Sequence, residues 1–224
     1  HPGLLRVEFE PTFVARATSN GKKVAVLSGG GSGHEPLHAG YVGVGMLDAA
    51  CPGQVFTSPT PDQMLAAAAA TNTGRGVLFI VKNYAGDTMN FQIASEMLDV
   101  ENATVLVNDD VAVENSKHTT GRRGVAGTLM VEKMVGAAAE AGAALLECKA
   151  VGDRVNTCTA SMGVALSSCT VPDAAAPTFD IGPAEMEIGV GIHGEPGRHR
   201  RAVMPASDIV ALLLDPVLKD LSLA

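Results

Sequence analysis

The chain has 224 residues, 46% hydrophobic and 18% charged, which is enough to bury one substantial core and does not require a second domain. Its formal net charge of −8 disfavours a role whose affinity comes from neutralising nucleic-acid phosphates. The longest apolar runs are far too short to cross a membrane and the N-terminus lacks a signal-peptide pattern, so we expect neither nucleic acid nor membrane as a partner.

Cysteine usage indicates a reducing compartment. The chain has no C-x-x-C pair and no histidine at zinc-ligand spacing beside a cysteine, so we expect reduced thiols that act as small buried hydrophobes. A cytoplasmic location follows from this interpretation. Because the chain begins with His1 and not Met, we also expect a trimmed or processed piece of a longer product. The four cysteines are Cys51, Cys148, Cys158 and Cys169.

Strand and helix patterns alternate along the chain. Short apolar, β-branched runs followed by glycine or polar residues predict buried strands, and longer apolar patterns with cap signals at Thr60 and Gly142 predict helices. The alternation predicts an α/β layered domain with a parallel or mixed β-sheet flanked by helices. In chain order, the expected elements are strand 24–27, helix 61–71, strand 77–81, helix 91–98, strand 104–107, helix 124–141, an extended connector 171–183, strand 188–192 and helix 207–221.

The first predicted strand runs into a glycine-rich turn that ends in His34, Glu35 and Pro36. Sheets of α/β proteins place ligands at such carboxyl ends, where glycines expose backbone N–H groups to an oxygen-rich ligand. The segment matches neither the P-loop nor G-x-G-x-x-G, so it is not a nucleotide loop. A structural tight turn would not need a His-Glu pair, which favours a small-ligand site.

Polar side chains follow the next two strands as well. Lys82 and Asp87 could polarise an oxygen and remove a hydroxyl proton, although a loop salt bridge is the more common interpretation of an isolated pair. Asn108, Asp109 and Asp110 suggest a metal, but nothing nearby completes an oxygen cage, so we predict a capped turn and no metal site.

The fourth predicted strand leads into His193, Gly194 and Glu195, which repeat the His-then-Glu-Pro order seen at His34. A single histidine is more often a hydrogen-bonded core residue than a catalyst, and we assign His38 and His118 that role. Histidines at two strand ends, together with Lys82 and Asp87, favour a functional site. The basic cluster 198–201 is expected to be a solvated loop or helix start in preference to an anion site.

Five motifs, in order and spread over most of the chain, make the sequence resemble the K-type, substrate-binding subunit of dihydroxyacetone kinases. They are 27–36 (LSGGGSGHEP), 56–61 (FTSPTP), 82–87 (KNYAGD), 121–126 (GRRGVA) and 191–196 (GIHGEP). The resemblance implies that His193 holds the ketone carbon as a hemiaminal, which selects ketones and aldehydes over glycerol. It also implies that Asp87 is the general base and that His34 assists by a hydrogen bond. The implied substrate-binding residues are Gly31, Ser32, Gly33, His34, Lys82 and Asp87.

The same resemblance implies the partners. This chain would bind no cofactor, because ATP or ADP with magnesium is expected on a separate L-type subunit or domain, which exchanges ATP or is recharged by a phosphocarrier. A homodimer is also implied. Family chains continue into a second α/β lobe, so residues 1–224 would be the N-terminal domain of the K-type subunit, with that lobe missing.

Three functions stay open from the sequence: a kinase component, a non-catalytic paralogue that senses dihydroxyacetone and regulates transcription, and a structural domain. The structural option leaves the clustered polar residues unexplained. The presence of His34, Asp87 and His193 together favours the enzyme, because a sensor needs the imidazole that binds the ketone but does not need a general base. A kinase for a related ketose such as erythrulose is an intermediate possibility that the motifs do not exclude.

Overall fold

The computed structural model describes residues 2–113, 121–172, 174–195 and 197–223, so the prediction for His118 lies outside the described residues. Within these residues, no helix is long and apolar enough to cross a membrane. The strands are β1 (Leu5–Phe9), β2 (Thr12–Arg16), β3 (Ala25–Ser32), β4 (Ala49–Val55), β5 (Val77–Lys82), β6 (Asn102–Val107), β7 (Val164–Ala165), β8 (Glu185–Ile188) and β9 (His199–Ala202). The helices are the short 3₁₀ helix η1 (Ala39–Tyr41), α1 (Pro61–Thr71), α2 (Ala85–Met97), α3 (Gly127–Glu140), α4 (Leu145–Thr157) and α5 (Ala206–Asp220).

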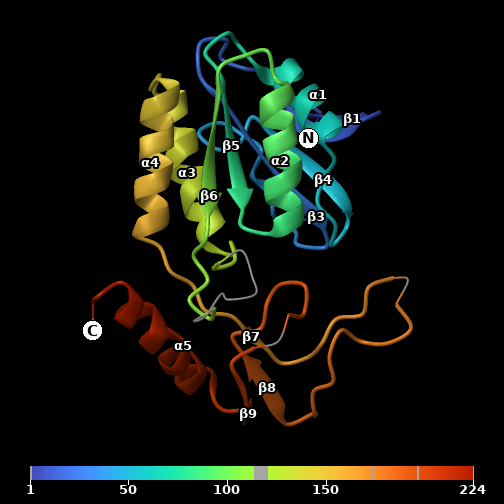
Figure 1. Ribbon diagram of the computed structural model, residues 1–224, viewed down its shortest axis with the longest axis vertical. Helices are drawn as coiled ribbons and strands as arrows, with labels where there is room; N and C mark the ends of the chain where they lie inside the picture. Colours follow the sequence, from blue (N-terminus) through green and yellow to red (C-terminus); the bar gives the residue numbers. More distant parts are fainter. Residues whose placement is uncertain (1, 114–120, 173, 196, 224) are drawn as a thin grey trace.

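The larger sheet is mixed and has the strand order β1-β2-β4-β3-β5-β6. Strands β4, β3, β5 and β6 run parallel to one another, whereas β2 is antiparallel to both β1 and β4. The carboxyl ends of the parallel strands therefore lie at one edge, and in Figure 1 this edge faces the segment that carries β7, β8 and β9. The expectation of a parallel or mixed sheet flanked by helices is confirmed.

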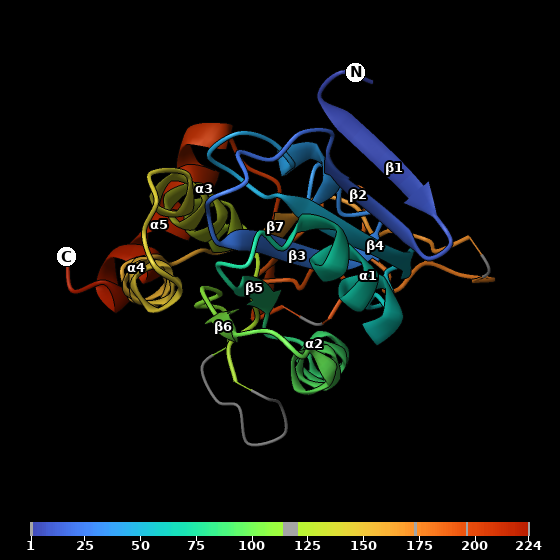
Figure 2. The same cartoon turned by 90° about the horizontal axis from the view of Figure 1, so that it is seen from above.

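Helices cover both faces of this sheet, because its central strands are apolar on both sides. In β5, Phe79 belongs to the core beneath α1 and α2, and the adjacent Ile80 belongs to the core beneath α3 and α4. Figure 2 shows the two helix pairs on opposite sides of the sheet. The larger part of the molecule is thus a three-layer α/β arrangement.

Local capping signals located several helix ends correctly. The predicted helix 61–71 has the observed bounds of α1, and Gln63 Oε1 accepts a hydrogen bond from Thr60 N–H at 3.0 Å. Gly142 has a φ of +94°, in the region that favours glycine beyond a helix end. Helix α2 begins six residues before the predicted position 91, because its first turn carries the polar motif that we assigned to a loop. Helix α4 was not predicted.

Two predictions in the last part of the chain, one of a strand and one of a loop or helix start, were wrong. The predicted strand 188–192 coincides with β8 only at Ile188, since Gly189 adopts a φ of +79° and the chain then turns, with Gly194 N–H donating to Gly191 O. The basic cluster 198–201, expected as loop or helix start, lies largely in strand β9, where Arg200 donates to Glu187 Oε2. Strands β1, β2 and β4 were not predicted.

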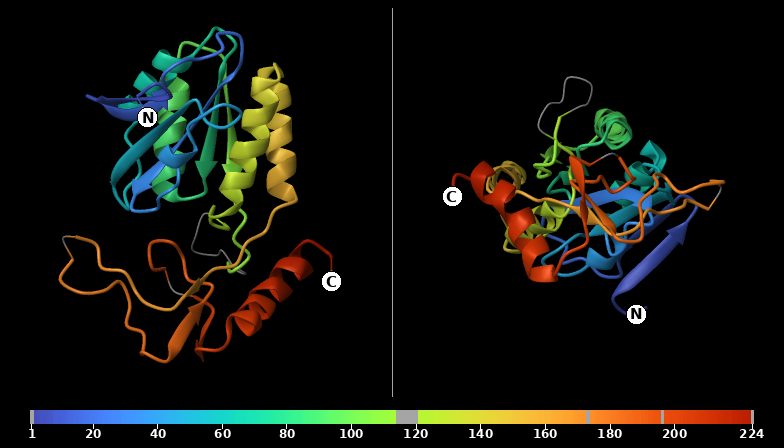
Figure 3. Two further views of the ribbon diagram at one scale, coloured as in Figure 1. Left: turned by 180° about the vertical axis from the view of Figure 1, so that it is seen from behind. Right: turned by 90° about the horizontal axis from the view of Figure 1, so that it is seen from below.

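Strands β7, β8 and β9 form a separate antiparallel sheet, and α5 follows it. Figure 3 shows this sheet and α5 beyond the carboxyl edge of the larger sheet, away from α1 and α2. A bidentate ion pair between Arg122 and Asp220 links α5 to the segment that precedes α3. Of the cysteines, Cys51 and Cys148 are buried free thiols as predicted, but Cys158 is exposed and Cys169 partly so.

Four charged side chains at the amino-terminal edge of the sheet form a buried ion cluster. Asp48 contacts Lys23 Nζ at 2.6 Å and Arg16 Nη1 at 3.0 Å, and Glu140 approaches the same two cations. The side chains of Lys23 and Asp48 are only 1% and 4% exposed. Neither charge is solvated, so each depends on the other.

We expect Asp48→Asn to lower the free energy of unfolding by about 3–5 kcal/mol, because the change leaves two buried cations without their main counter-charge. Urea denaturation followed by circular dichroism measures this loss. The control is Asp153→Asn, which breaks an exposed pair with Lys149 in α4 and should cost only about 0.3–0.5 kcal/mol. Equal effects of the two variants would contradict the buried-cluster interpretation.

Candidate functional site

Three of the predicted polar segments meet at the carboxyl edge of the larger sheet. Strand β3 ends at Ser32, just before His34; β5 ends at Lys82; and β6 leads into Asn108. These strands are neighbours in the order β3-β5-β6. Three of the four polar segments predicted at strand ends therefore follow parallel strands of one sheet, while the His193 segment follows β8 of the other sheet.

A cluster of rings joins the two parts of the molecule at this edge. His34 stacks on Phe56 with ring centroids 4.7 Å apart, and His193 meets His34 edge-on at 4.9 Å. The ring of Tyr84 also meets His193 edge-on, at 4.8 Å. Tyr84 OH and His34 Nε2 are buried and have no hydrogen-bond partner among the described residues. Such unpaired polar atoms are costly unless a ligand satisfies them.

The loop that carries His193 is shaped by Glu195. Oε2 of Glu195 accepts the backbone N–H of His193 at 3.0 Å, and its Oε1 lies 2.9 Å from the ring atom Nδ1. Burial opposes ionisation of this carboxyl, but the hydrogen bonds from His193 outweigh it and lower the pKa of Glu195 to about 2. Glu195 is therefore a carboxylate that accepts Nδ1–H, and this bond leaves Nε2 of His193 as the atom with a free lone pair.

Burial, followed by the nearby charge of Lys82 and by His193, lowers the pKa of His34 to about 4. His34 is consequently a neutral imidazole above about pH 5. The ordinary pKa of histidine is 6.5, so as the pH falls the His34 ring is protonated in the unfolded chain before it is protonated in the folded protein. The contribution of neutral His34 to the stability of the fold is therefore present above pH 6.5 and is lost as the pH falls to about 4.

The glycine-rich segment, which the sequence suggested was a turn, is mostly strand. Gly29, Gly30 and Gly31 pair in parallel register with residues of β4, and the turn begins only at Gly33, with a φ of +103°. A Cβ on Gly31 would lie 2.5 Å from Thr57 N, and one on Gly33 would lie 2.6 Å from the Phe56 ring. Glycine is thus required here for close packing against residues 56–57.

Lys82 and Asp87 are both buried beside this segment. Burial lowers the pKa of Lys82, and the charges of Asp87 and Glu132 oppose that shift. Lys82 Nζ lies 5.9 Å from the centre of the Tyr84 ring, which connects it to the ring cluster. The described residues contain no salt bridge between Lys82 and Asp87, so the loop salt bridge that we weighed for an isolated pair is not formed.

Sequence reasoning missed several residues of the site. Phe56 and Tyr84 lie inside the quoted motifs but had no role, and only their distance from His193 in space reveals one. The Ser32 hydroxyl donates to Gly53 O at 2.6 Å, so it serves the loop packing. Of the predicted site residues, His34, Lys82 and His193 come together around Tyr84, and Asp87 lies in the first turn of α2 behind Lys82.

The aspartates after β6 are structural, as predicted. Asp109 accepts the backbone N–H groups of Val125 and Gly127 and so fixes the start of α3, and Asp110 accepts Ala112 N–H and pairs with Arg123. Among residues 2–113 and the later described segments, no group of three or more His, Cys, Asp or Glu side chains is arranged to hold a metal ion.

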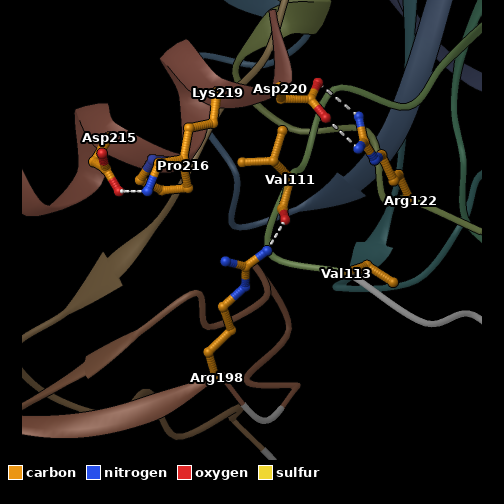
Figure 4. Close-up of a pocket in the computed structure, with 8 residues that line it drawn as sticks. All are labelled: Val111, Val113, Arg122, Arg198, Asp215, Pro216, Lys219 and Asp220. Carbon is orange, nitrogen blue, oxygen red and sulfur yellow. Dashed lines mark hydrogen bonds and ion pairs between the residues drawn. The ribbon is translucent and has the colours of Figure 1, made fainter. Parts of the chain in front are cut away.

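Two cavities of about 480 Å³ lie near this edge. One extends from His34 towards Met162 and Ile192 and is largely apolar, so it borders the ring cluster. The other, shown in Figure 4, lies under α5, where Arg122 is paired with Asp220 and Lys219 with Asp215. Arg198 in that cavity donates to Val111 O. The charged side chains that line this second cavity already form ion pairs or hydrogen bonds within the protein, so the edge around His34 and His193 is the stronger candidate site.

Comparison with known proteins gives the family. A protein-family model described as the Dak1 domain matches residues 1–224. The chain belongs to the Dak1 domain family. A dihydroxyacetone-binding subunit of a PTS-dependent dihydroxyacetone kinase from Listeria innocua is 54% identical over 207 residues, which are 91% of this chain and 63% of that protein. This Dak1 domain therefore spans about 63% of the length of that curated relative.

Solved structures of Dak1 relatives have the same fold. The native dihydroxyacetone kinase of C. freundii superimposes with a TM-score of 0.88 at 41% identity, covering 97% of this chain and 40% of that one. A dihydroxyacetone kinase operon co-activator superimposes with a TM-score of 0.90 at 32% identity, covering 99% of this chain and 69% of that one. The Dak1 fold thus occurs in both a kinase and a co-activator.

Replacing Lys82 by Met should raise the pKa of His34 in this Dak1 domain, because one of the two main causes of its depression, the ammonium charge, is removed while burial stays. Titration of the histidine Cε1–H signals by NMR measures the change. Lys22→Met, which alters an exposed lysine away from the ring cluster, should leave His34 unchanged. An unaltered His34 titration in Lys82→Met would contradict the placement of the ammonium beside the ring.

Proposed function

We propose that this chain is the dihydroxyacetone-binding component of a dihydroxyacetone kinase and that it holds the ketose covalently on His193. The observation that carries the proposal is the hydrogen bonding of the His193 ring. Its Nδ1 is hydrogen-bonded to the Glu195 carboxylate, and the ring lies against His34 and Tyr84 with its Nε2 left free. The 54% identity to a dihydroxyacetone-binding subunit supports the same substrate.

The binding step is an addition of the neutral imidazole to the ketone. Nε2 of His193 forms a bond to the carbonyl carbon, and the carbon–oxygen π pair moves to oxygen, which takes up a proton to become a hydroxyl. The ring gives up its Nδ1 proton in the same overall change, and the Glu195 carboxylate that accepts Nδ1–H stabilises the positive charge as it develops. A substrate without a carbonyl, such as glycerol, offers no carbon to attack.

The other site residues would orient the small substrate. Tyr84 OH and His34 Nε2 lack partners and are the nearest polar atoms to bond its oxygens, with Lys82 as a cation behind them. Burial raises the pKa of Tyr84 above its ordinary value, so its hydroxyl is a donor. Asp87 would remove the proton from the terminal hydroxyl as that oxygen attacks phosphorus, with His34 assisting.

The phosphoryl donor would be held elsewhere. Because the sequence resembles a K-type, substrate-binding subunit, we assign ATP or ADP with magnesium to an L-type subunit or domain that docks over the ketose. The homodimer, a cytoplasmic location and the choice between dihydroxyacetone and a larger ketose stay predictions.

A dihydroxyacetone-sensing co-regulator is the second candidate, because a co-activator shares the fold. Its identity to this chain is 32%, against 54% for the kinase subunit. Retention of His34 and Asp87 beside His193 also favours the kinase, since sensing does not require a base.

We expect His193→Ala in the full-length protein to abolish tight binding of dihydroxyacetone, because the covalent link supplies most of the orientation of so small a ligand. Isothermal titration calorimetry measures the affinity, and glycerol serves as the ligand control that should bind neither protein. Unimpaired binding of dihydroxyacetone by His193→Ala would refute the covalent proposal.

Asp87→Asn should keep dihydroxyacetone binding and reduce phosphoryl transfer by about 10²–10⁴-fold, the usual contribution of a general base. The measurement is a transfer assay with the L-type partner, with binding checked by calorimetry. Wild-type binding without any transfer, with active partner and donor present, would instead identify the chain as a sensor.

A further inference from the structure

A second histidine and carboxylate lie buried behind the site and have no role in the proposed chemistry. His38 Nδ1 lies 2.5 Å from Glu132 Oε1 and 3.0 Å from Ser28 Oγ. The side chain of His38 is 2% exposed and that of Glu132 is fully buried. His38 Nε2 and Glu132 Oε2 have no hydrogen-bond partner among the described residues. A buried imidazole and a buried carboxylate together are expensive to maintain without a function.

The hydrogen bonds fix the tautomer of His38. Ser28 Oγ donates its own hydrogen to Ile80 O at 2.7 Å, so towards His38 it offers only lone pairs. A lone pair on Nδ1 would face those lone pairs at 3.0 Å, which is repulsive. Nδ1 therefore carries the hydrogen and shares it between Ser28 Oγ and the Glu132 carboxylate. In the neutral ring, Nε2 is then a bare acceptor.

This acceptor lies near the Lys82 ammonium, with no hydrogen bond between the two atoms. A Cβ on Gly30 would be 2.7 Å from Lys82 Nζ and 3.3 Å from His38 Nε2, so both atoms approach the same point beside β3. Lys82 is itself 1% exposed. An ammonium at such depth needs acceptors and negative charge close by.

Resting on the proposed function, we propose that Ser28, His38 and Glu132 form a buried relay that positions the Lys82 ammonium and keeps it charged at the ketose site. His38 and Glu132 act as positioning residues. The Nε2 lone pair faces the ammonium without a hydrogen bond between the two atoms, and the Glu132 carboxylate supplies a compensating negative charge from α3.

All the charged and titratable groups around Lys82 bear on this role. Asp87, in α2, and Glu132, in α3, favour the charged ammonium, whereas burial disfavours it. His34 is neutral and does not add a repelling charge. Tyr84 presents its ring. Glu132 is thus one of two anions that hold Lys82 charged, and the other, Asp87, is the proposed base.

The test uses the full-length protein and two readouts of Lys82. The first is the ¹⁵Nζ NMR titration of Lys82, assigned with Lys82→Arg, which needs no ligand. The second is the pH dependence of dihydroxyacetone affinity measured by calorimetry. Glu132→Gln removes the negative charge with little change of shape, and Glu101→Gln, at an exposed position, is the matched control.

We expect Glu132→Gln to move the Lys82 titration, and the alkaline limb of ketose binding, to lower pH by about one unit, which is a tenfold change in the ratio of amine to ammonium. Glu101→Gln should change neither. His38→Asn keeps a donor for Glu132 but loses the Nε2 acceptor and should shift both readouts in the same direction. His38→Gln, whose amide oxygen reaches the Nε2 position, should restore them.

Unchanged Lys82 titration in folded Glu132→Gln and His38→Asn would overturn the relay, and equal shifts in His38→Asn and His38→Gln would overturn the role assigned to Nε2. If Glu132→Gln does not fold, the two His38 variants decide the matter. Failure of the wild-type protein to bind the ketose would refute the proposed function, and the ligand-free titration would still test the relay.

Discussion

The site depends on a three-glycine stretch of strand β3 that carries no side chains. Because Gly29, Gly30 and Gly31 stay paired with β4 while lacking Cβ atoms, the loop at residues 56–57 and the Lys82 ammonium can reach the backbone of β3 directly. This close approach brings Phe56 under His34 on one side and His38 to Lys82 on the other. Backbone packing in the sheet therefore leaves the room in which Phe56, Lys82 and His38 lie at its carboxyl edge.

The second constraint is charge. His34, Lys82 and His193 are all basic and lie close together in a partly buried place, where three positive charges would repel. The structure resolves this differently for each group: burial and Lys82 keep His34 neutral, Glu195 is a carboxylate beside His193, and Asp87 with Glu132 favours the Lys82 ammonium. The result is a cation, Lys82, near a neutral imidazole, His34, in an arrangement suited to a polar, uncharged ligand such as a small ketose.

How much of the structure can be predicted from the sequence depends on how local each sequence signal is. Helix α1 and its cap at Thr60 rest on neighbouring residues, and the polar ends of β3, β5 and β6 follow from continuous apolar runs, so both could be predicted. Strands β1, β2 and β4 could not, because β4 begins with small residues and contains Pro52, and its strand character comes from pairing with the glycines of β3. Tyr84 was inside a recognised motif, yet its role depends on a loop more than a hundred residues away.

The two histidine–carboxylate pairs, His193 with Glu195 and His38 with Glu132, also differ in how local they are in the sequence. In each, Nδ1 faces a carboxylate oxygen, so that in the neutral ring Nε2 keeps the lone pair. His193 and Glu195 are two positions apart on a partly exposed loop. Their pairing can therefore be predicted from the sequence, and a ligand can reach Nε2 of His193. His38 and Glu132 are 94 positions apart and sealed between β3 and α3, where no ligand reaches Nε2 and the lone pair can serve only a neighbouring protein group. Burial, and not the pair itself, separates the proposed nucleophile His193 from the proposed positioning residue His38.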